Sequence, residues 1–411
     1  MKYPTKIVNS QAETNILYKL KKSISILCLL ILSCASYASQ KPNFSAGTKY
    51  ARLFSVAANE LLQEGANGYP VFDLTIGFNR HPSDSSDFAR AFNYPVAGVG
   101  VSAALLNTMK TRKDAYLGNM FNAYLFMDWD LLRAGTFALG VKGHVGVGYN
   151  NGTYNPRTNP NNDFMGNRIM MYYGFGPYAK FHVADKWEVG ASAMLWHHSN
   201  SRMNLPNMGL NEWGVELFAR YYLEKPYLSN RKVNPVRPYG KKILWDVYAG
   251  GAPYVSDAIY FAYLDDRTRE WPFKPQARFV AGGDVMYKYC YVAASGIALD
   301  LIYSTGNDRL READIARFGK ADPAGYSPFF AGISFVQEIY FGNISMRATI
   351  GAHIGRRLGT GEALDKPTIW FQSLGGRYYF RKLGNTFIGF DSKVRYFSRA
   401  DNFALVVGKR F

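Results

Sequence analysis

A histidine and a serine two residues apart, His197 and Ser199, are the residues whose types and spacing could do chemistry in this sequence. They end the segment Trp187–Ser199, where apolar residues alternate with polar or small ones, a period typical of a β-strand. On a strand, residues two apart leave the same face, roughly 6.7 Å apart along the chain. An imidazole and a hydroxyl placed in this way can come within hydrogen-bond reach, as a base-activated serine nucleophile requires.

A third polar residue, Asn211, begins the next predicted strand and lies on its apolar face. If that face points at lipid, a titratable ring and a hydroxyl there carry a desolvation cost unless they have a function. Asn211 can orient the imidazole of His197 by accepting a hydrogen bond, although an amide cannot stabilise an imidazolium by charge. The alternative interpretation is that His197 and Ser199 are ordinary polar residues near a membrane interface.

The residues next to this group have the opposite parity. We therefore predict that His198, Glu212 and Glu216 lie on the inner face of the sheet and point into the lumen. Because His197 and His198 point to opposite faces, they cannot bind one metal ion together, and we predict no metal site. No glycine-rich loop follows a strand and opens a helix, so we predict no nucleotide or other cofactor.

The elements that must position these residues are a long series of alternating segments. Near the C-terminus, Asp391, Lys393 and Arg395 share one face. Three charges on one face require a hydrated or polar surrounding, which the lumen of a barrel supplies. The segments have about ten residues or more, whereas strands of soluble sheets average roughly five or six. They are residues 49–56, 69–78, 96–106, 118–131, 136–149, 170–183, 187–199, 212–223, 243–251, 277–287, 292–303, 328–341, 344–355, 368–380, 387–396 and 403–411.

This pattern predicts an all-β fold, an antiparallel transmembrane β-barrel of about 14–16 strands, with sixteen preferred. Short connections such as Gly342-Asn343 and long ones such as 150–168 alternate along the chain, which is typical of periplasmic turns and extracellular loops. Residues 224–241 fit this alternation poorly, because they are long and basic on the periplasmic side. They could instead join two units.

The N-terminal residues predict export. Lysines 19, 21 and 22 precede the short apolar run 24–32, and small residues lead to Ala38, so we expect residues 1–38 to be a cleaved signal peptide and 39–411 the barrel. A lipoprotein with Cys34 acylated is the alternative. The three cysteines exclude a disulfide scaffold and a cysteine-rich zinc site. The formal charge of +17 is dispersed over an exported chain, so we expect no nucleic-acid partner.

One sequence block is similar to a known family. His197-x-Ser199-Asn200, followed by Pro206-Asn207-x-Gly209-x-Asn211, resembles the lipid A 3-O-deacylase (acyloxyacyl hydrolase) family of outer-membrane barrels. Residues 393–401 and the tripeptide 68–70 resemble longer, Bacteroidetes-type members. The resemblance is dense over 69–223, the deacylase-like part, and thinner over the remaining strands, 242–411.

The resemblance implies a serine esterase of the Gram-negative outer membrane that removes an ester-linked acyl chain from lipid A, the anchor of lipopolysaccharide. Ser199 matches the nucleophile and His197 the base. Asn211 stands where the family has an acid, which implies slower turnover. The best-known members are eight-stranded, about half the size of this chain, so the extra strands could carry a function of their own.

Further roles follow for residues around this block. Asn200 and Asn207 are candidate oxyanion or positioning groups. Basic residues in or beside the predicted extracellular loops are candidates to bind the phosphates of the substrate, above all Lys110, Arg168 and Arg202. The alternative is that they simply bind neighbouring lipopolysaccharide. The alternative function is a non-enzymatic channel or a structural or binding barrel, whose lumen is lined, or plugged by pairing, by the residues Asp284, Asp300, Glu338, Asp391, Lys393 and Arg395.

Overall fold

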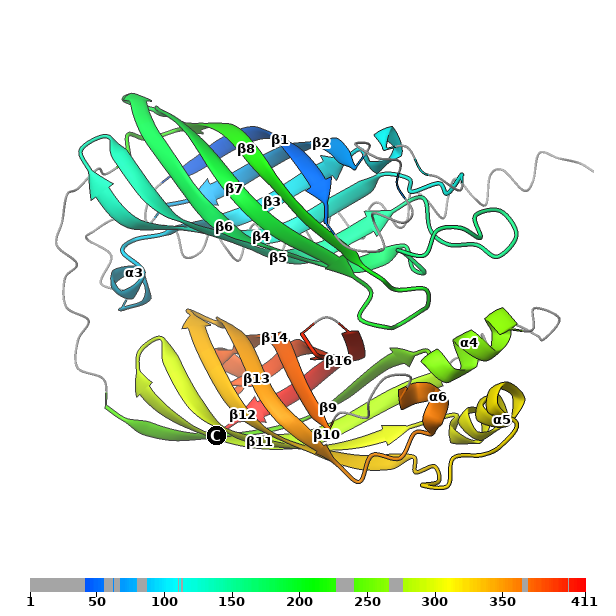
Figure 1. Ribbon diagram of the computed structural model, residues 1–411. Helices are drawn as coiled ribbons and strands as arrows, with labels where there is room; N and C mark the ends of the chain where they lie inside the picture. The colour runs from blue at the N-terminus through cyan, green and yellow to red at the C-terminus, as the bar shows by residue number, and fades with distance from the viewer. Residues whose placement is uncertain are drawn as a thin grey trace, which may run out of the picture.

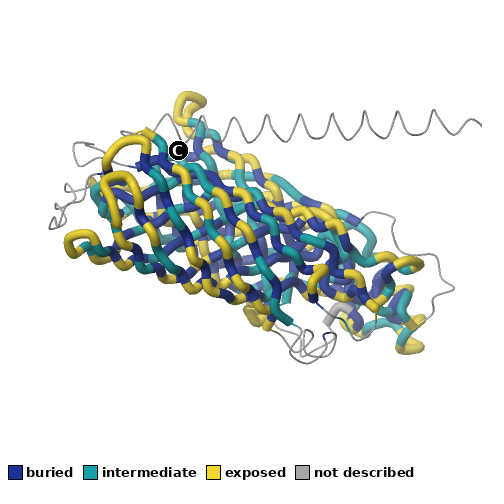
Figure 2. The backbone as a smooth tube through the Cα atoms, turned by 90° about the horizontal axis from the view of Figure 1, so that it is seen from above, coloured by how far each residue is buried: buried dark blue, intermediate teal, exposed yellow. Residues whose placement is uncertain are grey.

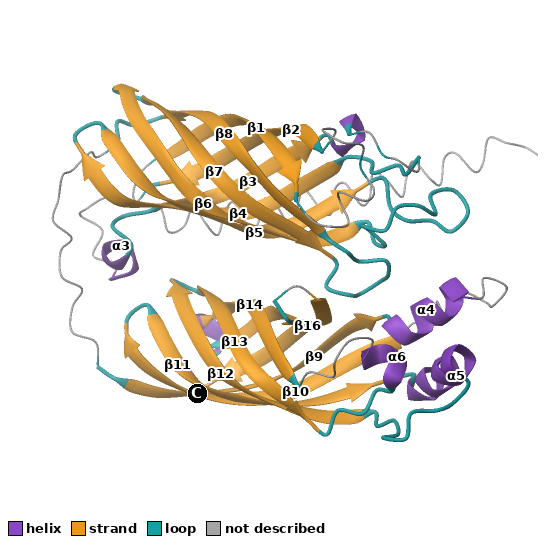
Figure 3. Ribbon diagram, viewed as in Figure 1, coloured by secondary structure: helices purple, strands orange, loops and turns teal. Residues whose placement is uncertain are grey.

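The computed structural model describes residues 41–54, 62, 67–79, 87–109, 111, 114–226, 240–265, 276–363, 369–397 and 399–411. These residues form sixteen strands, and every pairing between neighbouring strands is antiparallel (Figures 1 and 3). The predicted all-β barrel class is therefore confirmed. The predicted signal peptide, with Cys34 and Ala38, lies outside the described residues.

The strands close as two barrels of eight, and not as the single barrel that we expected. The first barrel consists of β1 (Pro42–Leu53), β2 (Gly68–Phe78), β3 (Val96–Ala104), β4 (Met120–Ala134), β5 (Phe137–Asn150), β6 (Ile169–Ala184), β7 (Trp187–Ser199) and β8 (Leu210–Tyr222). The second consists of β9 (Lys242–Tyr254), β10 (Gln276–Cys290), β11 (Ala293–Ser304), β12 (Phe329–Phe341), β13 (Ile344–Ile354), β14 (Trp370–Phe380), β15 (Thr386–Arg395) and β16 (Arg399–Arg410).

The expectation of a single barrel was wrong for a physical reason. Alternation along a strand decides which side chains face inward, but it does not say which strand the first one pairs with. In the structure, Thr48 of β1 lies opposite Leu217 of β8, so the first sheet closes before the chain reaches residues 224–241. The division between the barrels thus falls at the connection that fitted a single barrel poorly.

The outer walls are apolar, as transmembrane strands require. On β7, Trp187, Val189 and Leu195 are exposed while Glu188 and Met194 are buried. Figure 2 shows the same alternation of buried and exposed positions along the strands. An outward apolar band on a closed antiparallel sheet is the surface that a bilayer covers. Among the described residues, no helix is long and apolar enough to cross a membrane.

The barrel interiors are filled with paired charges. In the first, Lys49 lies 2.7 Å from Asp73 and 3.7 Å from Glu216. In the second, Lys393 on β15 pairs with Asp300 on β11. Strands that are not neighbours in the sheet can contact each other in this way only across the lumen. The inward register expected for Lys393 is therefore correct, and its charge is paired.

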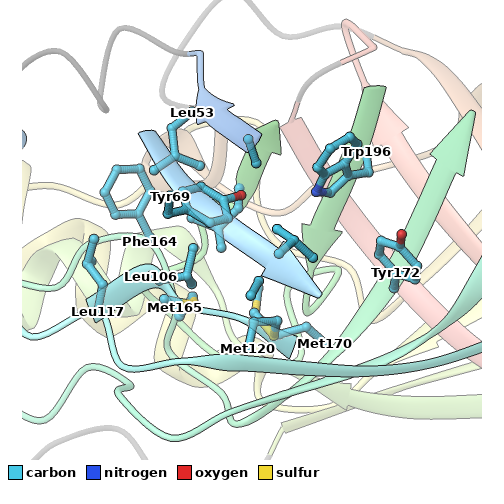
Figure 4. Packing of buried hydrophobic residues seen from close by; sticks show 14 of the residues in the cluster. Leu53, Tyr69, Leu106, Leu117, Met120, Phe164, Met165, Met170, Tyr172 and Trp196 are labelled. Carbon is cyan, nitrogen blue, oxygen red and sulfur yellow. The ribbon is translucent and has the colours of Figure 1, made fainter. Parts of the chain in front are cut away.

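An apolar cluster fills the loop end of the first barrel, by which we mean the end that carries the long connections (Figure 4). It joins strand residues such as Tyr69 and Trp196 to Phe164 and Met165 of the connection between β5 and β6. Trp196 and Leu210 belong to it, and they precede His197 and Asn211 in the sequence. The candidate site therefore rests on strands whose inner faces are firmly packed.

Short helices lie at the ends of the barrels (Figure 3). At the loop end of the second barrel, three of them pack together around Ala258, Leu310 and Leu358. At the opposite end, which we call the turn end, one helix lies beside the first barrel (Figure 1). The helices are α3 (Asp87–Ala91), α4 (Asp257–Asp265), α5 (Asn307–Phe318) and α6 (Thr360–Ala363), with the 3-10 turns η1 (Leu106–Thr108) and η2 (Arg381–Leu383).

Candidate active site

The structure brings His197 and Asn211 together. They lie directly opposite each other on the neighbouring strands β7 and β8. The Nδ1 atom of His197 is 2.8 Å from the Oδ1 atom of Asn211. Because an amide oxygen can only accept, this bond assigns the proton to Nδ1 and leaves Nε2 with its lone pair. His197 thus has the tautomer that a general base needs.

Ser199 ends β7 on the same face and is almost covered, with 7% of its surface exposed. Its Oγ atom accepts the backbone N–H of Ser201 at 3.0 Å and lies 3.1 Å from the side-chain nitrogen of Asn207. Among the contacts of the described residues, none joins the Ser199 hydroxyl to the His197 ring. The structure therefore shows the hydroxyl of the candidate nucleophile bonded to its own loop, through Ser201 and Asn207.

Glycine is required where the loop returns over the histidine. Gly209 has φ +68°, a left-handed conformation that other residues adopt at a cost. A Cβ atom there would lie 2.9 Å from the backbone oxygen of His198, 3.0 Å from Cε1 of His197 and 3.6 Å from Nε2 of His197. Gly209 thus keeps the catalytic edge of the imidazole clear, a role that its place in the sequence pattern alone does not reveal.

Asn200 and Asn207 take different positions. Asn207 contacts the Ser199 hydroxyl directly and accepts the N–H of Asn200 at 3.1 Å. Asn200 is fully buried, its Oδ1 accepts the N–H of Arg202 at 2.9 Å, and its Nδ2 has no partner among the described residues. Asn207 therefore positions the nucleophile, and the open donor of Asn200 is a candidate to bind a developing oxyanion.

Arg202 does not fit the phosphate-binding role that we expected. Its side chain is 2% exposed, and its guanidinium lies 3.0 Å from Asp257 and donates to the carbonyl of Val255 at 3.1 Å. Both partners belong to the second barrel, so Arg202 joins the barrels and its charge is already paired. Arg168 is exposed beside β6, where a phosphate can reach it, and Lys110 lies outside the described residues.

His198 faces the lumen, as its parity predicts. It is fully buried, with Nδ1 at 2.5 Å from Glu212 and Nε2 at 2.9 Å from Asn122. Its ring stacks on that of Tyr172 at 4.9 Å. His198 is thus a structural partner inside the barrel, separated from the outer wall by the sheet itself.

The loop after Ser199 also contacts the second barrel. The hydroxyl of Ser201 lies 2.7 Å from that of Ser392 on β15. Ser201 is the residue whose N–H bonds Ser199, so one short chain of contacts runs from the candidate nucleophile into the other barrel. This link could not be predicted from the sequence, because Ser392 is far away along the chain and serine hydroxyls are common.

No metal centre is evident in the described part of the chain, where three or more His, Cys, Asp or Glu side chains nowhere gather in a metal-binding arrangement.

Comparisons with known proteins bear on the second barrel. Residues 245–411 match the family described as acyloxyacyl hydrolase, C-terminal domain. The matched residues are the second barrel, whereas we expected the denser resemblance over 69–223. No curated protein matches the chain.

Solved structures similar to this chain include a mutant of the porin from Rh. blastica, at 9% identity, 90% coverage of this chain, 99% of that chain and a TM-score of 0.17. Pseudomonas aeruginosa OccK5 (OpdH) has 10% identity, 91% and 99% coverage, and a TM-score of 0.22. With scores this low, the fold rests on the strand pairings given above.

Proposed function

We propose that this protein is a serine esterase of the Gram-negative outer membrane that removes an ester-linked acyl chain from lipid A, and the match of residues 245–411 to the acyloxyacyl hydrolase C-terminal domain supports this proposal. Ser199 is the nucleophile, His197 the general base, and Asn211 orients His197. The observation that carries the proposal is the 2.8 Å bond between His197 Nδ1 and Asn211, which leaves Nε2 free to accept the serine proton.

The reaction follows from these groups. The Ser199 oxygen attacks the ester carbonyl carbon while His197 Nε2 takes its proton. The oxyanion that forms is stabilised by N–H donors, for which Asn200 Nδ2 is the candidate. His197 then gives the proton to the departing sugar alcohol, which leaves an acyl-serine. Water, deprotonated by His197, attacks that ester and releases the fatty acid with Ser199 restored.

The active residues belong to the first barrel. The second contains one histidine, His353, which is buried and bonds Asp401 at 3.3 Å across the lumen. The second barrel therefore has no histidine to act as the base on its lipid-facing wall, although this barrel carries the family match. We propose that catalysis takes place on the first barrel alone.

The substrate class follows from the location and the charge. An ester at a lipid-facing wall is presented by a membrane lipid, and lipid A carries its phosphates at the level of the loops. The exposed Arg168 and Arg157 lie in the connection between β5 and β6, where they can pair with such phosphates. The channel alternative has less support, because eight-stranded barrels have interiors that side chains fill.

The test is mass spectrometry of lipid A from cells that lack the gene and carry one variant each. We expect the wild type to release one acyl chain, and Ser199→Ala or His197→Ala to release none. His198→Ala is the matched control, because the neighbouring histidine faces the lumen, and His198→Gln serves if the alanine variant does not fold. Unchanged lipid A in the wild type, or an active Ser199→Ala variant that shows the heat-modified migration of a folded barrel, overturns the proposal.

A further inference from the structure

A cavity of about 710 Å³ lies between the two barrels, and His197 and Asn211 form part of its lining. Its volume is within the range of roughly 300–1,000 Å³ that is usual for ligand pockets. The first barrel contributes outward residues of β4 to β7, such as Met127 and Phe175. The second contributes residues of β12 to β14, such as Leu374. The candidate active site therefore opens into a space with two walls.

The lining has the chemistry of a hydrocarbon site. No Asp, Glu, Lys or Arg is among the lining residues that the structure describes. Aromatic and aliphatic side chains predominate, and the polar ones include the site residues themselves. A sugar or a phosphate in this space would lose its hydration without compensation, whereas methylene groups gain by leaving water.

The cavity extends from the site to the turn end of the barrels. Phe341, at the end of β12, closes that end against Phe92 and Phe88, with ring centroids 5.1 and 6.1 Å apart. At the loop end, the barrels are joined by Arg202 and by the Ser201–Ser392 contact. The cavity thus reaches from His197 and Asn211, toward the loop end, to three phenylalanine rings at the turn end.

We propose that this inter-barrel cavity, defined by Met127, Gly143, Phe175, Leu374, Phe341 and His197, holds the acyl chain of the ester that Ser199 attacks. The inference rests on the proposed function and deepens it. The chain lies along the first barrel with its carbonyl at the loop end, and the second barrel supplies the opposite wall. The extra eight strands are then the part of the enzyme that selects the acyl chain, and the phenylalanines limit its length.

One residue allows this proposal to be tested cleanly. Gly143 lies on the outward face of β5, and a Cβ atom built there meets no atom within 4 Å. A larger side chain at this position therefore enters the cavity without disturbing the barrel. Leu374→Trp narrows the cavity from the second barrel. Ala193→Leu is the matched control, because Ala193 is exposed on β7 of the same barrel but does not line the cavity.

The experiment measures kcat/KM of the purified full chain in detergent with p-nitrophenyl butyrate and p-nitrophenyl dodecanoate. We expect Gly143→Leu and Leu374→Trp each to lower the value for dodecanoate by about tenfold or more, the usual scale of discrimination in a hydrophobic pocket. The value for butyrate, whose chain ends near the site, should stay within about twofold, as should both values for Ala193→Leu.

The outcomes separate the two proposals. If Gly143→Leu and Leu374→Trp leave the ratio of the two substrates unchanged, the cavity does not hold the acyl chain, and the proposed function stands. If Leu374→Trp alone has no effect, the second barrel is not a wall of the site and the inference fails in its main point. If Ser199→Ala keeps wild-type activity on both esters, or the wild type has none, the proposed function itself fails.

Discussion

Asn211 occupies the position of an acid in the sequence pattern, and its amide oxygen supplies orientation without charge. In the structure it holds Nδ1 of His197 at 2.8 Å. A carboxylate there would in addition stabilise the imidazolium that forms when Ser199 loses its proton. Asn211 thus orients the imidazole but does not stabilise its charge, whereas an acid at this position would do both.

We therefore expect Asn211→Ala to lower kcat by about tenfold to a hundredfold, less than the loss in Ser199→Ala, because only the orientation of a general base is lost. Asn211→Glu should raise kcat above the wild-type value by adding charge. The measurement is the rate of acyl release from purified lipopolysaccharide at constant pH. A lower rate for a folded Asn211→Glu variant contradicts this account and shows that the amide geometry matters more than charge.

Gly209→Ala should reduce acyl release while the barrel stays folded. The substitution places a Cβ atom 3.0 Å from Cε1 of His197 and also strains a backbone with φ +68°. Gly135→Ala is the control, because Gly135 has φ +61° but no atom within 4 Å of its built Cβ. Backbone strain of about 1–2 kcal/mol is common to both variants, so a loss of activity confined to Gly209→Ala comes from the contacts of the new Cβ atom with the His197 ring and with the backbone oxygen of His198.

The sequence allowed part of this site to be predicted. The spacing of His197 and Ser199 and the parity of Asn211 place all three on one wall, because side-chain direction on a strand has a period of two. The partners of Ser199 and Arg202 could not be predicted. They depend on how a loop folds back, and on a second barrel whose Asp257 and Ser392 are distant in sequence.

Alternation also predicted the strands well at the scale of secondary structure. The segment 187–199 is β7 without change, and the ends of most other strands differ by a few residues. The largest difference is β1, which begins at Pro42 rather than at residue 49. Its first residues, Pro42 to Gly47, include few large apolar side chains, so their alternation was too weak to recognise.

The three helices above the second barrel depend on one buried carboxylate. Asp314 on α5 accepts the backbone N–H groups of Thr360 and Gly361, each at 2.8 Å, at the start of α6. We expect Asp314→Asn to weaken this junction by about 1–3 kcal/mol, because an amide cannot accept all of these bonds. Faster hydrogen exchange at Thr360 and Gly361 is the measurement. Glu312→Gln, an exposed change on the same helix, should leave that exchange unaltered.

The same junction should respond to alkaline pH. Burial, together with the hydrogen bond donated to Asp314, raises the pKa of Tyr326 to about 12 from its ordinary value of 10.0. Between these values the unfolded segment has lost the proton while the folded one keeps it, so the junction becomes less stable as the pH rises. Exchange at Thr360 should therefore accelerate above pH 10 beyond the intrinsic rate. A Tyr326→Phe variant that shows the same acceleration contradicts this origin.

For the whole molecule, neither the partner of β1 nor the contacts between the barrels could be predicted from the sequence, because both depend on how the sheets close. The contacts include Ser201 and Arg202 at the loop end, Phe341 with α3 at the turn end, and an apolar cluster in which Met171 and Tyr173 meet Phe390 and Phe403. The candidate nucleophile belongs to the loop-end joint, so the activity of the first barrel depends on how it meets the second.

This arrangement predicts a disulfide between the barrels. The hydroxyls of Ser201 and Ser392 are 2.7 Å apart, so the double variant Ser201→Cys, Ser392→Cys should cross-link on oxidation. Mass spectrometry of a digest identifies the linked peptides, with either single variant as the control. Adding Arg202→Ala should slow the cross-linking, because it removes the ion pair to Asp257. The same yield with and without Arg202 would show that this pair does not hold the barrels together.

The pairing of β16 with β9 closes the second barrel, and it extends to Phe411. Phe411 and Trp245 exchange two backbone hydrogen bonds, of 2.8 and 3.2 Å, beside the pairing of β16 with β9. Until β16 has paired with β9, that sheet keeps two unpaired edges, which are prone to pair with other chains. The first barrel needs nothing beyond Tyr222 for its own closure. Closure of the two halves is therefore independent: β1 and β8 can complete the half with Ser199 while β9 and β16 of the other half are still unpaired.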